Sequence, residues 1–118
     1  MPDWDHVVTL AQGELPEVDV STSYGTPALK VRRKLFARLH EDSEHLVLFV
    51  DLMEREALVQ SSPTSFLVTP HYRDWPMVLV NLARVDPDEL RELVIESWRR
   101  RAPKRLVSQY DTDSPELT

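Results

Sequence analysis

Residues 24–39, Tyr-Gly-Thr-Pro-Ala-Leu-Lys-Val-Arg-Arg-Lys-Leu-Phe-Ala-Arg-Leu, contain two short runs in which apolar and polar side chains alternate. Such alternation is typical of half-buried β-strands, and the basic residues between the runs are typical of an exposed turn. The stretch therefore predicts a β-hairpin with one apolar face and one cationic, aromatic face.

The length of the loop at the hairpin tip decides which residues face each other. Residues directly opposite in an antiparallel pair point to the same face of the sheet. A two-residue loop would set apolar Val31 opposite a lysine, whereas a loop of residues 32–34 sets Val31 opposite Leu35. We therefore expect the three-residue loop, which leaves Lys30 opposite Phe36 on the outer face. Such loops usually place one residue in the left-handed region, and no glycine is present at this tip.

This hairpin and two later stretches, residues 68–80 (Val-Thr-Pro-His-Tyr-Arg-Asp-Trp-Pro-Met-Val-Leu-Val) and 101–106 (Arg-Ala-Pro-Lys-Arg-Leu), resemble the MmcQ/YjbR family. The resemblance covers nearly the whole chain. It implies a frataxin-like α/β sandwich and a function in DNA binding through a double-wing motif. It also implies that His71 and Trp75 occupy recurring positions of the family motif. The family pattern usually has glycine at the hairpin tip, where this chain has arginine.

Length and composition limit the classes of protein to which this chain can belong. A chain of 118 residues and 13.7 kDa with 42% hydrophobic residues is sized for one domain with an ordinary core. The absence of cysteine excludes disulfides, thiolate metal sites and cysteine nucleophiles, and it suits a reducing compartment. No apolar run approaches the roughly 18 residues of a membrane span, and the N-terminus lacks the features of a signal peptide. We expect a cytoplasmic protein that does not enter a membrane.

The charges are segregated along the chain. A net charge of −6 and a pI of about 5.1 argue against tight non-specific binding to nucleic acid, because that affinity comes mostly from phosphate neutralisation. Nine of the 14 Lys and Arg residues nevertheless lie in residues 30–34 and 99–105. The sequence therefore predicts local positive patches on an acidic body.

Helix caps and side-chain periodicity predict the remaining elements. The expected helices cover residues 3–13, 51–60, 86–101 and 103–110, and the expected strands cover 18–22, the two arms of the hairpin, 45–50, 65–68 and 77–82. This order predicts an α+β two-layer sandwich, with an antiparallel sheet of about five to six strands and helices packed on one side. We expect a single domain over residues 1–110 and a disordered acidic tail over residues 111–118.

The first functional hypothesis is a DNA-binding module whose wings are the basic hairpin and a second hairpin over residues 66–82. Cationic side chains would hold the phosphate backbone, and Phe36 would stack on a base. The candidate residues are Lys30, Arg32, Arg33, Lys34, Phe36, Arg38, Arg73, Lys104 and Arg105. Binding would be weak and salt-sensitive. The alternative is that these cations only keep a strand edge in solution or stabilise a helix C-terminus.

The second hypothesis is a non-enzymatic module that binds a small ligand or another protein in a cleft. Residues 70–76 place large polar-tipped side chains between two prolines, and loops on a rigid scaffold commonly carry binding residues. The candidate cleft residues are Tyr24, His71, Tyr72 and Trp75, with His71 as a ligand contact rather than a base. The alternative is that Trp75 only closes the end of the core.

No catalytic motif is apparent in the sequence. A nucleophile elbow, a P-loop and a His-Glu-x-x-His zinc motif are all absent, and two glycines cannot form a glycine-rich phosphate cradle. The segment from His40 to His45 is expected to be a solvated turn rather than a metal site. We therefore expect no catalytic residues, no metal and no cofactor, in a monomer or weak dimer.

Overall fold

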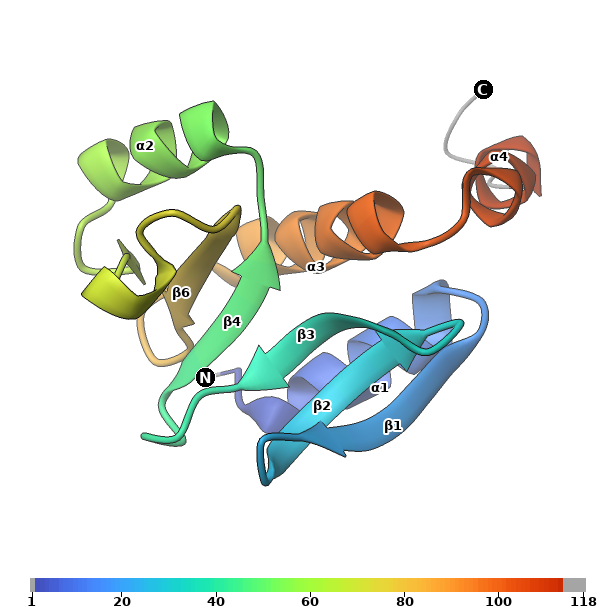
Figure 1. Ribbon diagram of the computed structural model, residues 1–118, viewed down its shortest axis with the longest axis horizontal. Coiled ribbons are helices and arrows are strands. Elements are labelled where there is room, and N and C mark those ends of the chain that lie inside the picture. Colours follow the sequence, from blue (N-terminus) through green and yellow to red (C-terminus); the bar gives the residue numbers. More distant parts are fainter. Residues whose placement is uncertain (1, 114–118) are drawn as a thin grey trace.

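A computed structural model describes residues 2–113 of the chain. The six strands of its sheet are β1 (Val18–Ser23), β2 (Thr26–Val31), β3 (Lys34–Leu39), β4 (His45–Phe49), β5 (Phe66–Leu67) and β6 (Met77–Asn81). The helices are α1 (Trp4–Glu14), α2 (Leu52–Ser61), α3 (Pro87–Arg101) and α4 (Lys104–Asp113), with a short 3-10 helix η1 (Pro70–Tyr72). All strand pairs are antiparallel, in the spatial order β1-β2-β3-β4-β6-β5. The predicted α+β fold class is confirmed (Figure 1).

Three of the helices begin where the sequence places an aspartate cap. The carboxylates of Asp3, Asp51 and Asp86 accept hydrogen bonds from backbone N–H groups two or three residues further on. These N–H groups have no partner within the helix, so each cap stabilises a helix start by about 1 kcal/mol. Local chemistry therefore explains why these elements match their predicted positions closely.

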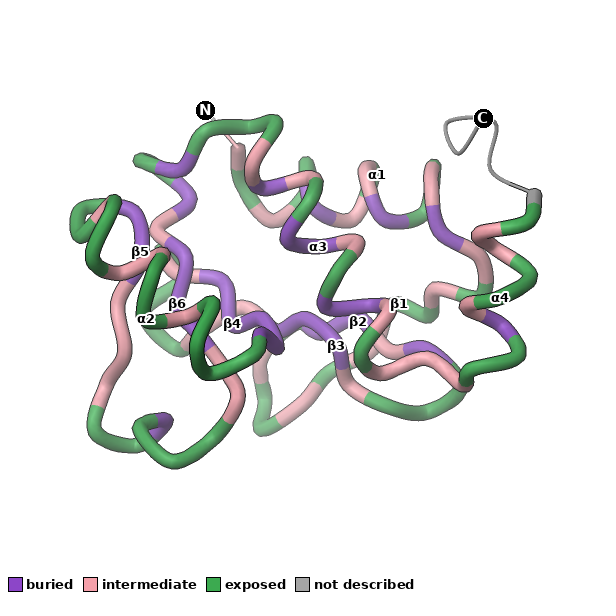
Figure 2. Tube along the Cα trace, turned by 90° about the horizontal axis from the view of Figure 1, so that it is seen from above, coloured by how far each residue is buried: buried purple, intermediate pink, exposed green. Residues whose placement is uncertain are grey.

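The main core lies between one face of the sheet and helices α1 and α3. Strand residues Leu29, Leu48 and Val78 are fully buried there, together with Val94 and Trp98 of α3. Figure 2 shows the buried positions running along the central strands and along α3. The long helix α3 therefore fixes the inner face of the sheet, and any binding site on the sheet itself must use the opposite, outer face.

The tip of the β2–β3 hairpin is a two-residue turn. Arg32 and Arg33 have φ angles of 50° and 71°, and Val31 lies opposite Lys34. Two successive residues at positive φ are typical of a type I′ turn, whose twist matches that of the flanking strands. The predicted loop of residues 32–34 is therefore wrong: the preference of the hairpin for this turn outweighs the matching of apolar side chains at the tip.

A β-bulge restores the apolar register further along the hairpin. The pairing shifts between Leu29 and Lys30, so that Lys30 lies opposite Leu35 while Leu29 lies opposite Ala37. Phe36 is the extra residue, and its side chain is fully buried in the main core. The prediction that Phe36 lies on the outer face as a stacking surface is therefore wrong.

Helix α3 satisfies backbone groups at the bulge. The Ser97 hydroxyl donates to the Phe36 carbonyl oxygen and accepts from the Phe49 N–H at 2.9 Å. Arg101 Nε donates to the Leu35 carbonyl oxygen at 2.8 Å. Buried carbonyl groups need such partners, so these side chains of α3 make the bulge tolerable.

Replacing Arg33 with glycine is expected to raise the free energy of unfolding by about 0.5–1 kcal/mol, because glycine removes the Cβ strain at positive φ. Arg33→Ala removes the same charge but keeps the Cβ, so it should give no comparable gain. Urea denaturation of the two variants and the parent measures the effect. Equal stabilisation by glycine and alanine would show that charge repulsion, and not backbone strain, dominates at the tip.

The C-terminal helix extends further than the sequence predicts. Helix α4 continues to Asp113, so residues 111–113 are helical and do not belong to a disordered tail. Asp111 accepts hydrogen bonds from Arg99 of α3, whose guanidinium also lies over the Tyr110 ring. This ion pair between two helices is not visible in local sequence patterns. Residues 114–118, the rest of the predicted tail, lie outside the described residues.

Candidate functional site

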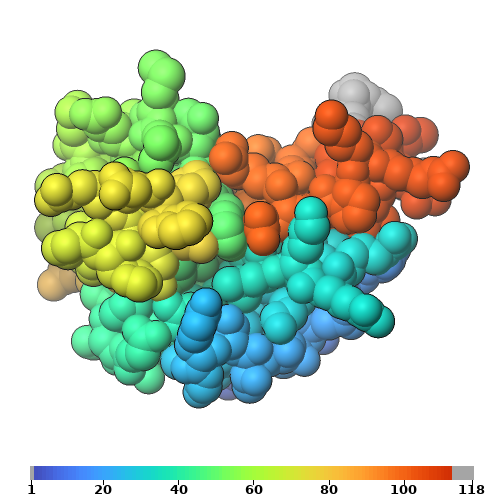
Figure 3. Space-filling view, viewed as in Figure 1, coloured from blue at the N-terminus to red at the C-terminus, as the bar shows by residue number. Residues whose placement is uncertain are grey.

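The outer face of the sheet carries a second, smaller apolar cluster. Val47 of β4, Leu79 of β6 and Tyr72 of η1 are buried there, and Met77 packs against them. The segment 68–76 crosses this face, so it covers part of the sheet and leaves the rest open. On the face seen in Figure 3, the yellow segment that holds η1 lies beside the blue to cyan surface of β1–β3.

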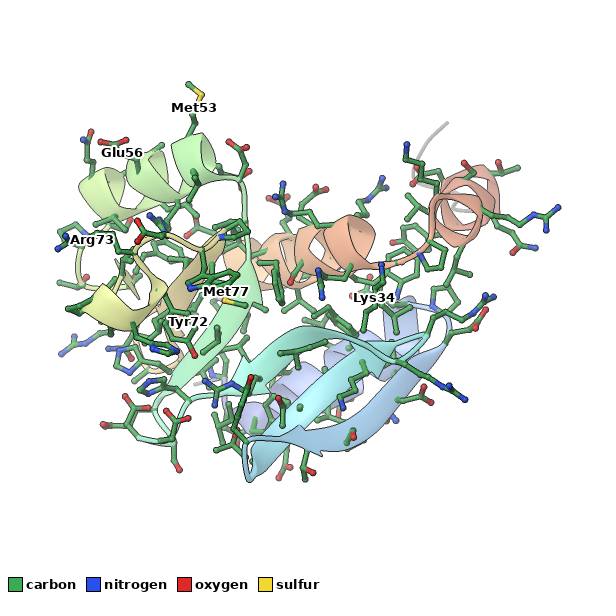
Figure 4. The ribbon with its side chains drawn as sticks, in the orientation of Figure 1. Lys34, Met53, Glu56, Tyr72, Arg73 and Met77 are labelled. Carbon is green, nitrogen blue, oxygen red and sulfur yellow. The ribbon has the colours of Figure 1, made fainter. Side chains whose placement is uncertain are left out.

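A cavity of about 630 Å³ opens on this outer face. It is lined by Tyr24, Arg38, His40, Glu41, Val47, Thr69, His71, Tyr72, Trp75 and Met77. All four residues that the sequence suggests for a ligand cleft are in this set, although they come from the β1–β2 turn and from the 70–76 segment. The structure therefore brings them together around one cavity, and Figure 4 shows Tyr72 and Met77 side by side within it.

Two aromatic side chains at the cavity are unusually exposed. Tyr24 is 89% exposed and Trp75 is 59% exposed. Tyr24 and Gly25 have φ angles of 52° and 79°, so a tight turn fixes the place of Tyr24 at the end of the β1–β2 hairpin. Because Trp75 is largely exposed, the alternative that it only closes the end of the core is wrong.

Arg38 of β3 lies at the polar side of the cavity and is only 4% exposed. Its Nη1 donates to Thr26 Oγ1 at 3.1 Å and to Glu41 Oε1 at 2.7 Å, and its Nη2 donates to the Tyr72 hydroxyl. Burial lowers the pKa of Arg38, but the hydrogen bonds to Glu41 and Tyr72 outweigh burial and raise that pKa above its usual value. Arg38 is therefore buried and paired, and the alternative that it only keeps a strand edge in solution is wrong.

Glu41 is the charged partner of Arg38 and belongs to the turn between β3 and β4. Its side chain is 59% exposed, and the hydrogen bond from Arg38 lowers the pKa of its carboxyl group. Its second oxygen, Oε2, lies 3.2 Å from His40 Nε2. Glu41 thus joins two other residues of the cavity wall while remaining largely in water.

Asp42 holds the same turn in place. Its carboxylate accepts from the N–H groups of Glu44 and His45 at 2.9 and 3.0 Å and lies 2.7 Å from His45 Nδ1. Burial raises the pKa of Asp42, but these hydrogen bonds outweigh it and lower the pKa to about 2. The segment from His40 to His45 is thus a turn, but the Asp42 carboxylate is hydrogen-bonded in it rather than free in water as predicted. Within residues 2–113 no group of three or more His, Asp or Glu side chains is arranged to hold a metal.

Asp42→Asn tests this turn through its pH dependence. The folded carboxyl has a lowered pKa, so its stabilisation is complete above the ordinary value of 3.8 and is lost as the pH falls through the interval down to about 2. Asparagine keeps an acceptor but not the charge, so the parent should be more stable by about 1 kcal/mol at pH 6, allowing for solvent screening. Urea denaturation between pH 6 and pH 3 should show this difference shrinking. A difference that is constant with pH would contradict an ionic role for Asp42.

The wall formed by residues 70–77 is held by an arginine that the sequence does not single out. Arg55 of α2 donates from Nη1 to the carbonyl oxygens of Tyr72, Trp75 and Met77 at 3.0, 2.7 and 3.2 Å. Its Nη2 donates to the Arg73 carbonyl oxygen at 2.8 Å. One side chain thus fixes four backbone groups of the segment. Only proximity in space reveals this role, because nothing in the local pattern of α2 distinguishes Arg55 from a solvated arginine.

Comparison with known proteins supports the relationship that the sequence predicts. A sequence model of the YjbR family matches residues 13–100. The chain belongs to the YjbR family. A crystal structure of a Deinococcus radiodurans protein with a DUF419 domain, which is the same family, aligns with a TM-score of 0.74 over 93% of this chain and 88% of that chain. At 24% identity this likeness shows the fold alone.

Uncharacterised proteins of Mycobacterium bovis and Mycobacterium tuberculosis are relatives of this YjbR-family chain. They are 40% identical to it over 58 residues, which is 49% of this chain and 45% of each relative. The match therefore spans about half the length of these curated relatives. Their names state no activity.

The residues predicted to bind nucleic acid do not form one surface in this YjbR-family structure. Phe36 is buried, Arg38 is paired inside the cavity wall, and Arg32 donates to Glu17, with Nη2 2.8 Å from Oε2. Lys30 is half-buried opposite Leu35. The exposed members are Arg32, which is paired with Glu17, and Arg33, Lys34, Arg73, Lys104 and Arg105.

The exposed cations divide between two parts of the molecule. Arg73 and Lys34 lie far apart in Figure 4, so Arg73 is not next to the hairpin tip. The hydrogen bond from Arg101 to Leu35, by contrast, holds the end of α3 against the start of β3. The two basic segments of the sequence, 30–34 and 99–105, therefore meet at one end of the protein.

The helices also bear on membrane insertion. None of the helices among the described residues combines the length and the apolar character that crossing a membrane requires.

Proposed function

We propose that this YjbR-family chain is a non-enzymatic module that binds a small molecule in the cavity on the outer face of the sheet, and that it acts in the cytoplasm. The observation that carries the proposal is the convergence of three chain segments on one cavity of about 630 Å³. Cavities of some 300–1,000 Å³ that combine an apolar lining with a few polar groups are typical of small-ligand sites.

The exposed aromatic residues support this proposal. Tyr24 and Trp75 present large aromatic surfaces to solvent at one cavity, and grouped exposed apolar surfaces of this kind commonly mark ligand-binding grooves. The apolar side chains of Val47 and Met77 lie in the same lining. A ligand with a flat apolar body would cover these four side chains together.

The rigidity of the wall is a second support. Arg55 holds the backbone of residues 72–77, and the Tyr72 hydroxyl is fixed by Arg38. A wall that is ordered before binding loses little conformational entropy on binding, which favours affinity for small molecules.

Binding of 2-naphthamide and 2-naphthoate, two flat probes of matched shape, tests the proposal. In a two-dimensional amide NMR titration, either probe should shift the signals of Tyr24, Arg38 and residues 71–77, with a dissociation constant of about 1 mM for compounds of this size. Trp75→Ala should weaken this binding by about tenfold. Met53→Ala, at an 83% exposed position on α2, is the matched control and should leave it unchanged. The absence of shifts for both probes would refute the proposal.

A second candidate function is weak DNA binding at the basic end of the molecule. It is favoured by the contact between Arg101 and Leu35, which joins two basic segments that are far apart in the sequence. The exposed cations there include Arg33, Lys34, Lys104 and Arg105. Helix macrodipole stabilisation accounts for cations at the end of α3, but it does not account for those at the hairpin tip.

Titration of a labelled DNA duplex at two salt concentrations tests this second function. The double variant Lys34→Ala with Lys104→Ala should weaken binding and reduce the salt slope by about two units if each residue contacts a phosphate. Arg73→Ala removes a cation elsewhere and is the control. An unchanged slope in the double variant, or an equal change in the control, would contradict a DNA surface at this end.

A further inference from the structure

We propose that the small molecule bound in this cavity carries an anionic group on a flat apolar body, and that Glu41 occupies the position which that anionic group takes. This inference rests on the proposed ligand-binding function and adds the chemical class of the ligand. It is carried by the unequal burial of the two partners in the Arg38–Glu41 pair.

The buried guanidinium of Arg38 requires a negatively charged partner. Its side chain is only 5% exposed, and a buried cation is costly unless an opposite charge compensates it. Two of its three hydrogen-bond partners, Thr26 and Tyr72, are neutral. Among the described residues, Glu41 supplies the one carboxylate hydrogen-bonded to its guanidinium.

Glu41 is held much less firmly than Arg38. Its side chain is 59% exposed and belongs to a surface turn, so its carboxylate can return to water without a large desolvation cost. One oxygen of Glu41 meets Arg38 Nη1 and the other lies 3.2 Å from His40 Nε2. The carboxylate therefore makes a single hydrogen bond to the guanidinium and no bidentate pair, which would be the stronger arrangement.

A ligand anion can meet the Arg38 guanidinium from within the cavity. Arg38, His40 and Tyr72 all line it, so the polar groups that contact Glu41 or Arg38 also border the ligand space. The Arg38 guanidinium carbon lies 5.7 Å from the centre of the Tyr24 ring. The anionic end of a ligand would thus lie beside an exposed aromatic ring, while Trp75 and Met77 offer apolar contact to its body.

Glu41 acts in this arrangement as an internal competitor. While Glu41 is paired with Arg38, an incoming anion must displace it. The net gain in binding free energy is then the difference between the free energy of the ligand–Arg38 pair and that of the Glu41–Arg38 pair, which are similar. Removing the charge of Glu41 should therefore strengthen the binding of anionic ligands and leave neutral ligands of the same shape nearly unaffected. This selective effect on anionic ligands distinguishes displacement of Glu41 from a general change in the pocket.

Four naphthalene probes with one body and different end groups test the inference: 2-naphthoate, 2-naphthyl phosphate, neutral 2-naphthamide and cationic 2-naphthylmethylamine. Their dissociation constants are measured by NMR titration of the parent protein, Glu41→Gln and Glu44→Gln. Glu44 is exposed on the same turn, and its replacement changes the net charge equally. Glu41→Gln should tighten the binding of the anionic probes by about three- to tenfold and change 2-naphthamide by less than about twofold. Glu44→Gln should change all four by less than about twofold.

The outcomes separate the two proposals. If 2-naphthamide binds in the cavity at least as well as the anionic probes, and Glu41→Gln has no selective effect, the pocket stands and the anionic ligand class is refuted. Equal tightening by Glu41→Gln and Glu44→Gln would also refute it, because overall charge would then explain the effect. If no probe shifts the pocket signals, both proposals fail. If the anionic probes bind and Glu41→Gln tightens them selectively, the ratio of 2-naphthoate affinity to 2-naphthyl phosphate affinity distinguishes a carboxylate ligand from a phosphate ligand.

Discussion

Replacing Phe36 with alanine should lower the free energy of unfolding by about 3–5 kcal/mol. Phe36 is fully buried and lies in the core that α3 covers. Truncation removes a large apolar surface from the core and leaves a cavity that the packed helix cannot fill. Urea denaturation followed by circular dichroism measures the change.

The neighbouring substitution Leu35→Ala is the matched control. Leu35 is only half-buried and lies opposite Lys30, so its truncation should cost about 1 kcal/mol. The register expected from simple alternation places Leu35 in the core and Phe36 outside, and it reverses the order of the two effects. A larger loss for Leu35→Ala than for Phe36→Ala would therefore contradict the bulge between Leu29 and Lys30.

Replacing Arg55 with methionine should both destabilise the protein and disorder the wall of the cavity. The substitution removes hydrogen bonds to four carbonyl groups of residues 72–77 but keeps an apolar stem of similar length. Because the freed carbonyl groups of this surface segment can bind water, the expected loss is about 1.5–3 kcal/mol rather than the sum of four bonds. Amide hydrogen exchange should speed up across residues 72–77, and probe binding should weaken by about tenfold.

Arg73→Met is the control for this prediction. Arg73 is exposed in the same segment, and it contributes its backbone carbonyl, not its side chain, to the contact with Arg55. Its replacement should leave stability and exchange rates close to those of the parent. If Arg55→Met weakens probe binding without altering exchange in the segment, then Arg55 acts through its charge and not by holding the wall.

Much of the architecture could be predicted because it depends on local chemistry. Aspartate caps at Asp51 and Asp86 define helix starts, and the apolar run from His45 to Phe49 defines a central strand. The candidate cleft residues could also be selected from their side chains, since large polar-tipped residues between prolines are typical of a binding loop. What could not be selected was Arg55, because its contacts are made with a segment that follows it by 17 or more residues.

The sequence by itself determined the α+β class, the antiparallel pairing of the hairpins and the acidic balance of charge, because each follows from composition, caps or short-range periodicity. The family followed from the resemblance of residues 24–39, 68–80 and 101–106 to its members. Only the tertiary structure decided that Phe36 enters the core and that Arg38 is buried beside a cavity. The bulge that turns Phe36 inward is stabilised by Ser97 of α3, 61 residues away, and the pairing of Arg38 needs Tyr72, 34 residues away. Alternation along a strand cannot foresee such contacts, because the energy that selects them comes from side chains brought close only when the chain has folded.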